Sequence, residues 1–412
     1  MSEFNPRPLM TVSPMYRPWP TLVNSVFDFR NTGLPPQQDF LFLHNRVGLY
    51  PTAGPHMLIK DPSLLGSHLE KLRADIEKAV PKKFEGNIIL DFDIWSPLWR
   101  NTRNDCDGTE FGGCGDYDDN DYDFQDDWVE TWEEVNPEKC SQWKSRGKDL
   151  FYNKMATTYE MTVAEFFTET IRAIREVRPQ AKIGVLGHIY GPYMPDGSEN
   201  AEYKDDNADM YWLYEEVDLL VPRIPFELDR NIDEEQGVLL SDYRKLIDSI
   251  LKETWEIALA IGDNKKEIFP FYPMQFSNRQ SPHFGKMLLS PIMQTALDQA
   301  YSNSCHGCYL WYGLASDKNV ADVKKYMQEH LKPSIEALDD GIYIEPKERY
   351  EDFPRSKPRI TEEKAEAQSA FVEDKQETAD DGYTASEDFS AFFGKEGITF
   401  TIPYEAIRRH FL

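Results

Sequence analysis

The sequence predicts a (β/α) barrel, TIM-like but distorted, with an acidic loop insertion and extended N- and C-terminal segments. Between about residue 20 and about residue 338, short apolar runs alternate with longer amphipathic segments. Continuous apolar runs separated by helical segments are typical of parallel strands buried on both faces. Repetition of this unit within a chain of 412 residues, long enough for one large core, favours a closed barrel over an open sheet.

The elements follow one another in a regular order. The strand candidates are 39–44 (DFLFLH), 87–92 (NIILDF), 182–190 (KIGVLGHIY), 217–224 (VDLLVPRI), 267–272 (EIFPFY) and 307–312 (GCYLWY). The helical patterns between and after them are 64–80, 156–178, 239–261, 291–302 and 320–331. Since barrels of this kind carry their functional groups at the C-terminal ends of the strands, we expect the site there.

The segments outside the barrel differ from it in composition. Residues 1–22 form a Pro-rich arm in which prolines, beginning with Pro6 and Pro8, oppose regular structure. The barrel domain is expected at 23–338, followed by a charged flexible linker at 339–388. Residues 389–412 turn apolar and aromatic again, which predicts docking either on the chain's own barrel or on a partner.

The charge of the chain is strongly acidic. The net charge of −27 argues against nucleic acid as a partner. Residues 104–138 hold 14 acidic side chains and no Lys or Arg, and we interpret this insertion as a solvated acidic loop. Five acids fit the spacing of a calcium loop, but Phe124 occupies the turn position that needs Gly, so neither metal nor cofactor is predicted. Alternatively, tryptophans anchor the insertion to the barrel or to a partner: Trp128, Trp132 and Trp143.

The cysteines and the N-terminus bear on the compartment. No apolar run approaches the roughly 18 residues that cross a bilayer, so no membrane span is predicted. The odd count of five cysteines and the lack of an apolar leader favour an intracellular protein, or a secreted one if the start has been processed. Cys305 and Cys308 have CxxC spacing without a second pair, which predicts small buried side chains rather than a zinc site.

The sharpest feature is DFDIWSPLWR, which begins at Asp91. Asp91 and Asp93 end an apolar run, and strand alternation sends both to the same face. Two close carboxylates repel each other, so the pKa of one should rise and that group can stay protonated near neutral pH. A proton donor beside an ionised neighbour is what cleavage of a glycosidic bond requires. Two acids that cap a strand end in a solvated loop fit the spacing equally well.

The segment GNIILDFDIWSPLWRN resembles the catalytic strand of the hyaluronidases, a family of glycoside hydrolases. Four further segments resemble parts of that family in the same order: HNRVGLYP, FFTETIRAIREVRPQAKIGVLGHIYGPYMPD, YWLYEEVDLLVPRIPF and GCYLWYGLASDKNVADVKKYMQEHLKPSIEAL. Together these segments cover roughly residues 40–338. The resemblance implies a barrel that acts on a glycan containing N-acetylhexosamine.

The resemblance also implies substrate-assisted retention. In this chemistry an acid protonates the leaving oxygen while the substrate's own 2-acetamido oxygen attacks the anomeric carbon. On the matching positions, Asp93 is the proton donor, Asp91 orients and charge-stabilises the acetamido group, and Tyr190 helps to hold it. The implied substrate-binding residues are Trp311, which packs under the sugar, Asp196, near the position of a pocket acid, and Trp95 of the motif. An aromatic face and an acid at its edge suit carbohydrate binding.

Several departures from the family pattern point away from a secreted enzyme that acts on hyaluronan. Asp93 stands where the family has Glu, and general acid catalysis depends on hydrogen-bond reach. Pro225, with Phe226 beside it, stands where the family has a second Tyr. Ser96 replaces the Arg of Trp-Arg-Pro, and the closing helix has Val323 or a neighbour where a Cys is usual.

Three functions therefore remain open. The first is a hyaluronidase-like endo-hydrolase. The second is a catalytically lapsed barrel that serves as a structural or interaction protein, with 1–22, 104–138 and 389–412 as docking elements. The third is a lectin-like module that binds a glycan without cleaving it.

Overall fold

The computed structural model of the chain describes residues 5–8, 10–11, 39–44, 46–92, 94–102, 124–193, 199–226, 236–261, 266–274, 276, 286–288, 290–311 and 325–331. The predicted linker at 339–388, the segment at 389–412 and Val323 lie outside these residues. None of the described helices is long and apolar enough to cross a membrane.

The strands form a closed parallel barrel, which confirms the predicted fold class. They are β1 (Asn5–Pro8), β2 (Met10–Thr11), β3 (Phe40–Leu43), β4 (Asn87–Asp91), β5 (Lys182–Leu186), β6 (Leu219–Val221), β7 (Glu267–Ile268), β8 (Phe271–Pro273) and β9 (Gly307–Trp311). They pair in the orders β2-β3-β4-β5-β6-β7 and β1-β9-β8, and every pair of these strands is parallel. Because β1 leads directly into β2 and β7 directly into β8, the two orders join into one closed circuit.

The barrel separates two hydrophobic cores. Its interior is filled by side chains from β3 to β9: Leu41, Ile89, Leu186, Leu219, Val221, Phe269, Phe271 and Tyr309. At the N-terminal end of this inner core, Asp39 Oδ1 accepts from Asn87 N at 2.9 Å, and Asp39 Oδ2 accepts from the Tyr309 hydroxyl at 3.2 Å. Filling by alternate side chains is the packing expected of a closed parallel barrel, since successive strand residues face opposite sides.

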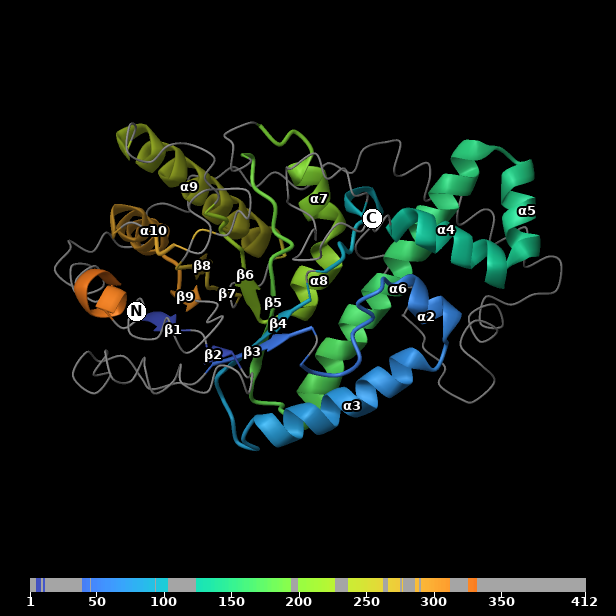
Figure 1. Cartoon of the computed structure of the whole chain (residues 1–412), viewed down its shortest axis with the longest axis horizontal. Helices are drawn as coiled ribbons and strands as arrows, with labels where there is room; N and C mark the ends of the chain where they lie inside the picture. Colours follow the sequence, from blue (N-terminus) through green and yellow to red (C-terminus); the bar gives the residue numbers. More distant parts are fainter. Residues whose placement is uncertain are drawn as a thin grey trace.

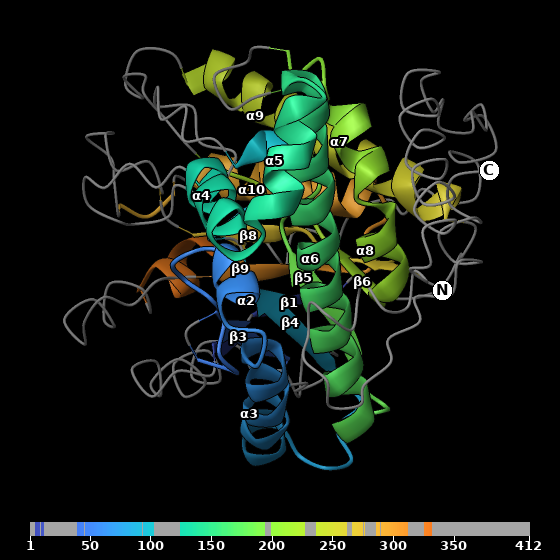
Figure 2. The same ribbon diagram turned by 90° about the vertical axis from the view of Figure 1, so that its right-hand side faces the viewer.

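The outer core lies between the strands and the helices around them (Figure 1, Figure 2). The longer helices are α3 (Leu64–Ala79), α6 (Lys148–Val177), α9 (Gln236–Ala260) and α10 (Ser290–Ser302). The shorter ones are α2 (His56–Lys60), α4 (Phe124–Val135), α5 (Pro137–Ser145), α7 (Tyr203–Asp209), α8 (Tyr211–Glu216), the 3-10 turn η2 (Trp99–Asn101) and the π-helical turn η4 (Met327–Leu331). The long helices match the predicted amphipathic segments, although α6 begins earlier than its pattern indicated.

The Pro-rich arm contributes the strands that close the barrel, so the prediction that its prolines exclude regular structure is wrong for β1 and β2. Asn5–Pro8 pair with β9, and Met10–Thr11 pair with β3. Pro6 and Pro8 are two residues apart, so their missing N–H groups fall on the same flank of the strand. The other flank keeps its donors, which explains how a Pro-rich segment can still form a parallel strand.

The described part of the acidic insertion is helical rather than a solvated loop. Residues 104–123 lie outside the described part, but Phe124–Val135 and Pro137–Ser145 form α4 and α5, which pack beside α6 (Figure 1). Trp128 and Trp132 are buried, and Trp143 packs on Trp132 at 5.7 Å between ring centroids. The tryptophans therefore anchor the insertion to the chain's own barrel, as one of the two alternatives predicted.

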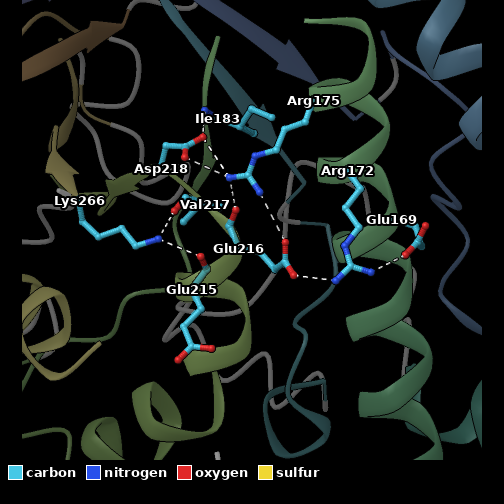
Figure 3. Close-up of polar contacts among 9 residues, drawn as sticks. All are labelled: Glu169, Arg172, Arg175, Ile183, Glu215, Glu216, Val217, Asp218 and Lys266. Carbon is cyan, nitrogen blue, oxygen red and sulfur yellow. Dashed lines mark hydrogen bonds and ion pairs between the residues drawn. The ribbon is translucent and has the colours of Figure 1, made fainter. Parts of the chain in front are cut away.

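The N-terminal ends of β5, β6 and β7 are joined by a charged network (Figure 3). Asp218 Oδ2 accepts from Ile183 N at the start of β5 at 2.9 Å, and both Asp218 oxygens lie 3.1 Å from Arg175 of α6. Lys266, before β7, donates to the carbonyl oxygens of Glu215 and Val217. Because these contacts occupy the end of the barrel opposite the predicted site, we assign them to stability.

The CxxC segment lies at the entry to β9. Cys305 and Cys308 are free and buried, and burial raises the pKa of both thiols. The prediction of small buried side chains is confirmed.

Candidate functional site

The strand register places Asp91 at the mouth of the barrel. Asp91 is the last residue of β4, two positions after Ile89 of the inner core. It pairs with Leu43, which packs on the inner core, and its carbonyl oxygen accepts from His44 N at 3.0 Å. Because residues two apart share a face, the half-buried Asp91 faces the interior at the C-terminal end of β4.

Two predicted site residues cannot be placed, and one only in part. Asp93 and Asp196 lie outside the described residues. Trp311 is the last residue of β9, where its backbone pairs with Pro273, so it sits at the same end of the barrel as Asp91. The proposed roles of these three residues stay predictions.

Trp95 lies behind the strand end. Its indole is fully buried, donates to the Pro51 carbonyl oxygen at 3.0 Å and stacks on Tyr50 at 4.9 Å between centroids. A sugar would reach this indole only if the surrounding residues moved. In the structure Trp95 supports the segment after β4, and its role in substrate binding stays a prediction.

Tyr190 joins the segments that follow β4 and β5. Burial raises the pKa of Tyr190, and the side chains of Ser96 and Asn101, which lie near its hydroxyl, oppose this rise. Its half-buried ring packs against the outer core. The inner-core residue contributed by the end of β5 is Leu186. Tyr190 is therefore placed to hold the loop after β4, and its contact with an acetamido group stays a prediction.

β5 ends earlier than predicted because its backbone turns into the left-handed region. Gly187 has φ 79° and His188 has φ 55°, a conformation that is costly for a residue with a Cβ. His188 Nε2 lies 3.3 Å from the carbonyl oxygen of Phe92, the residue between the two predicted catalytic aspartates. His188 has no signal in the sequence, because 182–190 has the apolar pattern of one continuous strand.

A charged cluster fixes the loop after β4 to α7. Arg100 of η2 contacts Asp206 Oδ1 at 2.5 Å and Asp209 Oδ2 at 2.7 Å. Asn101 Nδ2 donates to Asp206 Oδ2 at 3.2 Å. These residues were missed because their acidic partners are more than 100 positions away in the chain.

Arg223 brings a positive charge to the mouth of the barrel. It pairs with Phe271 of the inner core in an isolated parallel bridge beyond the end of β6, and it lies two residues after Val221 of that core. Both relations place Arg223 on the inward-facing side, where it is exposed to solvent. Strand alternation in VDLLVPRI places Arg223 on the same face as Leu219 and Val221, and this pattern could have identified it from the sequence.

The described residues contain no grouping of His, Cys, Asp and Glu that suits a metal ion. Of the acids that fit the calcium-loop spacing, Asp127 and Glu130 lie on α4, and the others lie outside the described residues. Asp127 instead lies 3.9 Å from His56 Nδ1.

Comparisons with known proteins agree with this architecture. A family profile described as "Hyaluronidase" matches residues 24–107. Hyaluronidase of Apis mellifera is 21% identical over 290 residues, which cover 66% of this chain and 65% of that protein. Hyaluronidase-3 of Cerastes cerastes is 24% identical over 322 residues, covering 71% of this chain and 61% of that protein. The chain thus spans less than two thirds of the length of these relatives.

The structural comparison covers a larger share of this chain and of its match than the sequence comparisons do. The crystal structure of bee venom hyaluronidase matches with a TM-score of 0.60 at 18% identity, covering 81% of this chain and 99% of that one. The closed parallel barrel is therefore the fold that this chain shares with bee venom hyaluronidase. In sequence the chain resembles the hyaluronidases as a distant relative.

Proposed function

We propose that the chain is an endo-glycoside hydrolase of a glycan that contains N-acetylhexosamine. The observation that supports this proposal most directly is the inward-facing position of Asp91 at the end of β4. Asp93, two residues further along, is the proposed general acid. Its carboxyl group protonates the glycosidic oxygen while the acetamido oxygen of the same sugar attacks the anomeric carbon, so that the C–O bond to the leaving sugar breaks.

The second half of the proposed reaction returns the enzyme to its starting state. Asp91 stabilises the positive charge that develops on the acetamido group as its oxygen bonds to carbon. Water then attacks the anomeric carbon and gives its proton to the Asp93 carboxylate. The acetamido oxygen leaves, and the anomeric configuration is retained.

Arg223 supports an acidic sugar as part of the substrate. Arg223 follows β6, which is two strands away from β4, or about 10 Å along the barrel wall. In the direction of the strands it lies one inward-facing residue further towards the mouth than Asp91. A guanidinium at that distance would contact a neighbouring sugar rather than the ring over Asp91. Bee venom hyaluronidase has been solved with a hyaluronic acid tetramer, which makes hyaluronan the first substrate to test.

A reducing-end assay on hyaluronan and chondroitin tests the proposal. Wild type should release reducing ends, Asp91→Asn should abolish release, and Asp93→Asn should do the same, because an amide is too weak an acid to protonate the leaving oxygen. If neither wild type nor a well-folded Asp93→Glu variant releases reducing ends, hydrolysis of these glycans is excluded.

A catalytically lapsed barrel is the second candidate function. The side chain that β5 contributes to the inner core near Asp91 is the apolar Leu186, and Asp93 is shorter than the Glu of the family. A silent wild type that becomes active as Asp93→Glu would support this candidate. Residues 5–8, 10–11 and α4 pack on the barrel itself, so the proposed docking elements are 389–412 and the parts of 1–22 and 104–138 that lie outside the described residues. Glycan binding without release would instead support a lectin-like module.

A further inference from the structure

The segment at the end of β5, residues 187–190, contacts the candidate catalytic strand end at two places. His188 Nε2 lies 3.3 Å from Phe92 O, and the side chains of Ser96 and Asn101 lie near the Tyr190 hydroxyl. Phe92 follows Asp91 directly, and Ser96 and Asn101 belong to the segment after it. The conformation of the β5 end therefore bears on the backbone that follows Asp91.

The hydrogen bonds of the strand ladder do not extend to the whole β5 end. Gly187 N still donates to Val221 O of β6 at 3.0 Å, but Gly187 and His188 both have positive φ, and the regular strand ends at Leu186. A backbone of this kind persists only where its surroundings hold it in place. The holding groups come from the helices that follow in the sequence.

Asn207 of α7 is the centre of these holding contacts. Its Nδ2 donates to Tyr190 O at 2.9 Å, and its Oδ1 accepts from Tyr190 N at 2.9 Å, so one amide group satisfies both polar atoms of the same residue. Nδ2 also donates to Glu253 Oε1 of α9 at 3.0 Å. Asn207 is 1% exposed, and an amide has two donor hydrogens, both of which are used here.

Glu253 keeps the amide of Asn207 in this orientation, and Tyr214 holds His188 beside it. Glu253 is buried and fixes which end of the amide faces α9. The hydroxyl of Tyr214 lies 2.5 Å from His188 O and 3.2 Å from Asn207 Oδ1. Since a hydroxyl has one proton, the shorter contact to His188 takes it, and Tyr214 binds the left-handed residue directly.

We propose that Asn207 is a positioning residue for the strand-end aspartates, acting through the end of β5. The catalytic part of this inference rests on the proposed hydrolase function, whereas the positioning itself does not. Replacement by Ala removes the bonds to Tyr190 N and O, which frees the β5 end and with it the contacts to Phe92, Ser96 and Asn101.

Asp218 offers a matched control at the other end of the same strand. Asp218 accepts from Ile183 N at the start of β5, as Asn207 does from Tyr190 N at its end (Figure 3). Asp218→Ala and Asn207→Ala should both lower the melting temperature. Hydrogen exchange of peptides that cover the end of β4 should accelerate in Asn207→Ala alone. Unchanged exchange there would overturn the inference, with or without catalytic activity.

Kinetics provide the second readout if the wild type is active. Asn207→Ala should lower kcat by about tenfold or more with little change in KM, because small displacements of reacting groups are costly. The pH profile of kcat should also shift, since the pKa of a protonated aspartate depends on its neighbours. Asp218→Ala should change neither. Equal effects of both variants on kcat and on the profile would reduce Asn207 to a structural role.

A compensating pair keeps the inference testable if Asn207→Ala folds poorly. Asn207→Asp faces the Glu253 carboxylate with a second acceptor, so exchange at the β4 end should accelerate. Adding Glu253→Gln supplies an amide donor to the carboxylate introduced on α7 and should restore part of the protection. No recovery in the double variant would count against the inference. A wild type that cleaves no glycan refutes the proposed function and leaves the exchange result to decide the positioning role.

Discussion

Acidification should weaken the fold through one buried histidine beside the site. His68 of α3 is fully buried, and its Nδ1 accepts from Leu49 N at 2.9 Å. That bond places the ring proton on Nε2, which donates to Thr170 Oγ1 at 3.0 Å, while Thr170 donates to Phe166 O at 2.6 Å. Burial lowers the pKa of His68 to about 4 from an ordinary 6.5, since the charged ring would lose its water of hydration.

The sign and size of the effect follow from linkage. The unfolded chain binds a proton to His68 below pH 6.5, whereas the folded chain does so only near pH 4, so stability is complete above 6.5 and falls as the pH drops towards 4. The full difference is about 3 kcal/mol in unfolding free energy, of which about 2 kcal/mol is lost by pH 5.

Urea denaturation followed by tryptophan fluorescence at about pH 7.5, about pH 6 and about pH 5 measures this loss. Carboxylates and the half-buried His56 and His306 also titrate, so wild type is compared with His68→Gln, which lacks the ring. The variant should be less stable at neutral pH but should lose about 2 kcal/mol less than wild type on going to pH 5. Equal losses in both proteins would refute the reasoning.

Two further predictions concern the mouth and the closure of the barrel. Arg223→Gln should weaken the binding of hyaluronan oligosaccharides by about tenfold in calorimetry and leave the binding of neutral N-acetylglucosamine oligomers unchanged. The control variant Arg244→Gln, on the exposed side of α9, should change the binding of neither glycan. Equal losses of affinity for both glycans in Arg223→Gln would contradict an anion contact. Deletion of residues 1–11 should lower the melting temperature and promote aggregation, because the edges of β3 and β9 lose their partner. A peptide of residues 1–12 added in trans should restore part of the stability, and a truncated protein that melts like wild type would show that the closing strand is dispensable.

The strands and long helices of the barrel were predictable because burial produces local sequence patterns. Strands buried on both faces are continuous apolar runs, and helices buried on one face are amphipathic. NIILDF and GCYLWY read as buried strands, and the structure contains both as β4 and β9. The end of β5 was misplaced because a left-handed turn at His188 has no signal in an apolar run. β1 was missed because its partner, β9, lies about 300 residues away and its prolines oppose a strand in isolation.

The candidate site divides in the same way. Asp91 could be assigned from spacing and resemblance, since two acids at the end of one strand form a local pattern. The surroundings of Trp95 and Tyr190 depended on residues far away in the chain: Trp95 is buried against Tyr50, and the backbone of Tyr190 is bonded by Asn207. Residue type alone did not distinguish these positions from an open sugar-binding surface.

The sequence by itself determined that this chain forms parallel strands between amphipathic helices, with Asp91 at the end of one strand, because alternation and hydrophobic burial act over a few residues. Only the tertiary structure decided how the barrel closes, that Arg223 faces its mouth and that Asn207 holds the end of β5. These outcomes depend on hydrogen bonds and packing between residues far apart in the chain, whose free energies exist only once the whole barrel has assembled.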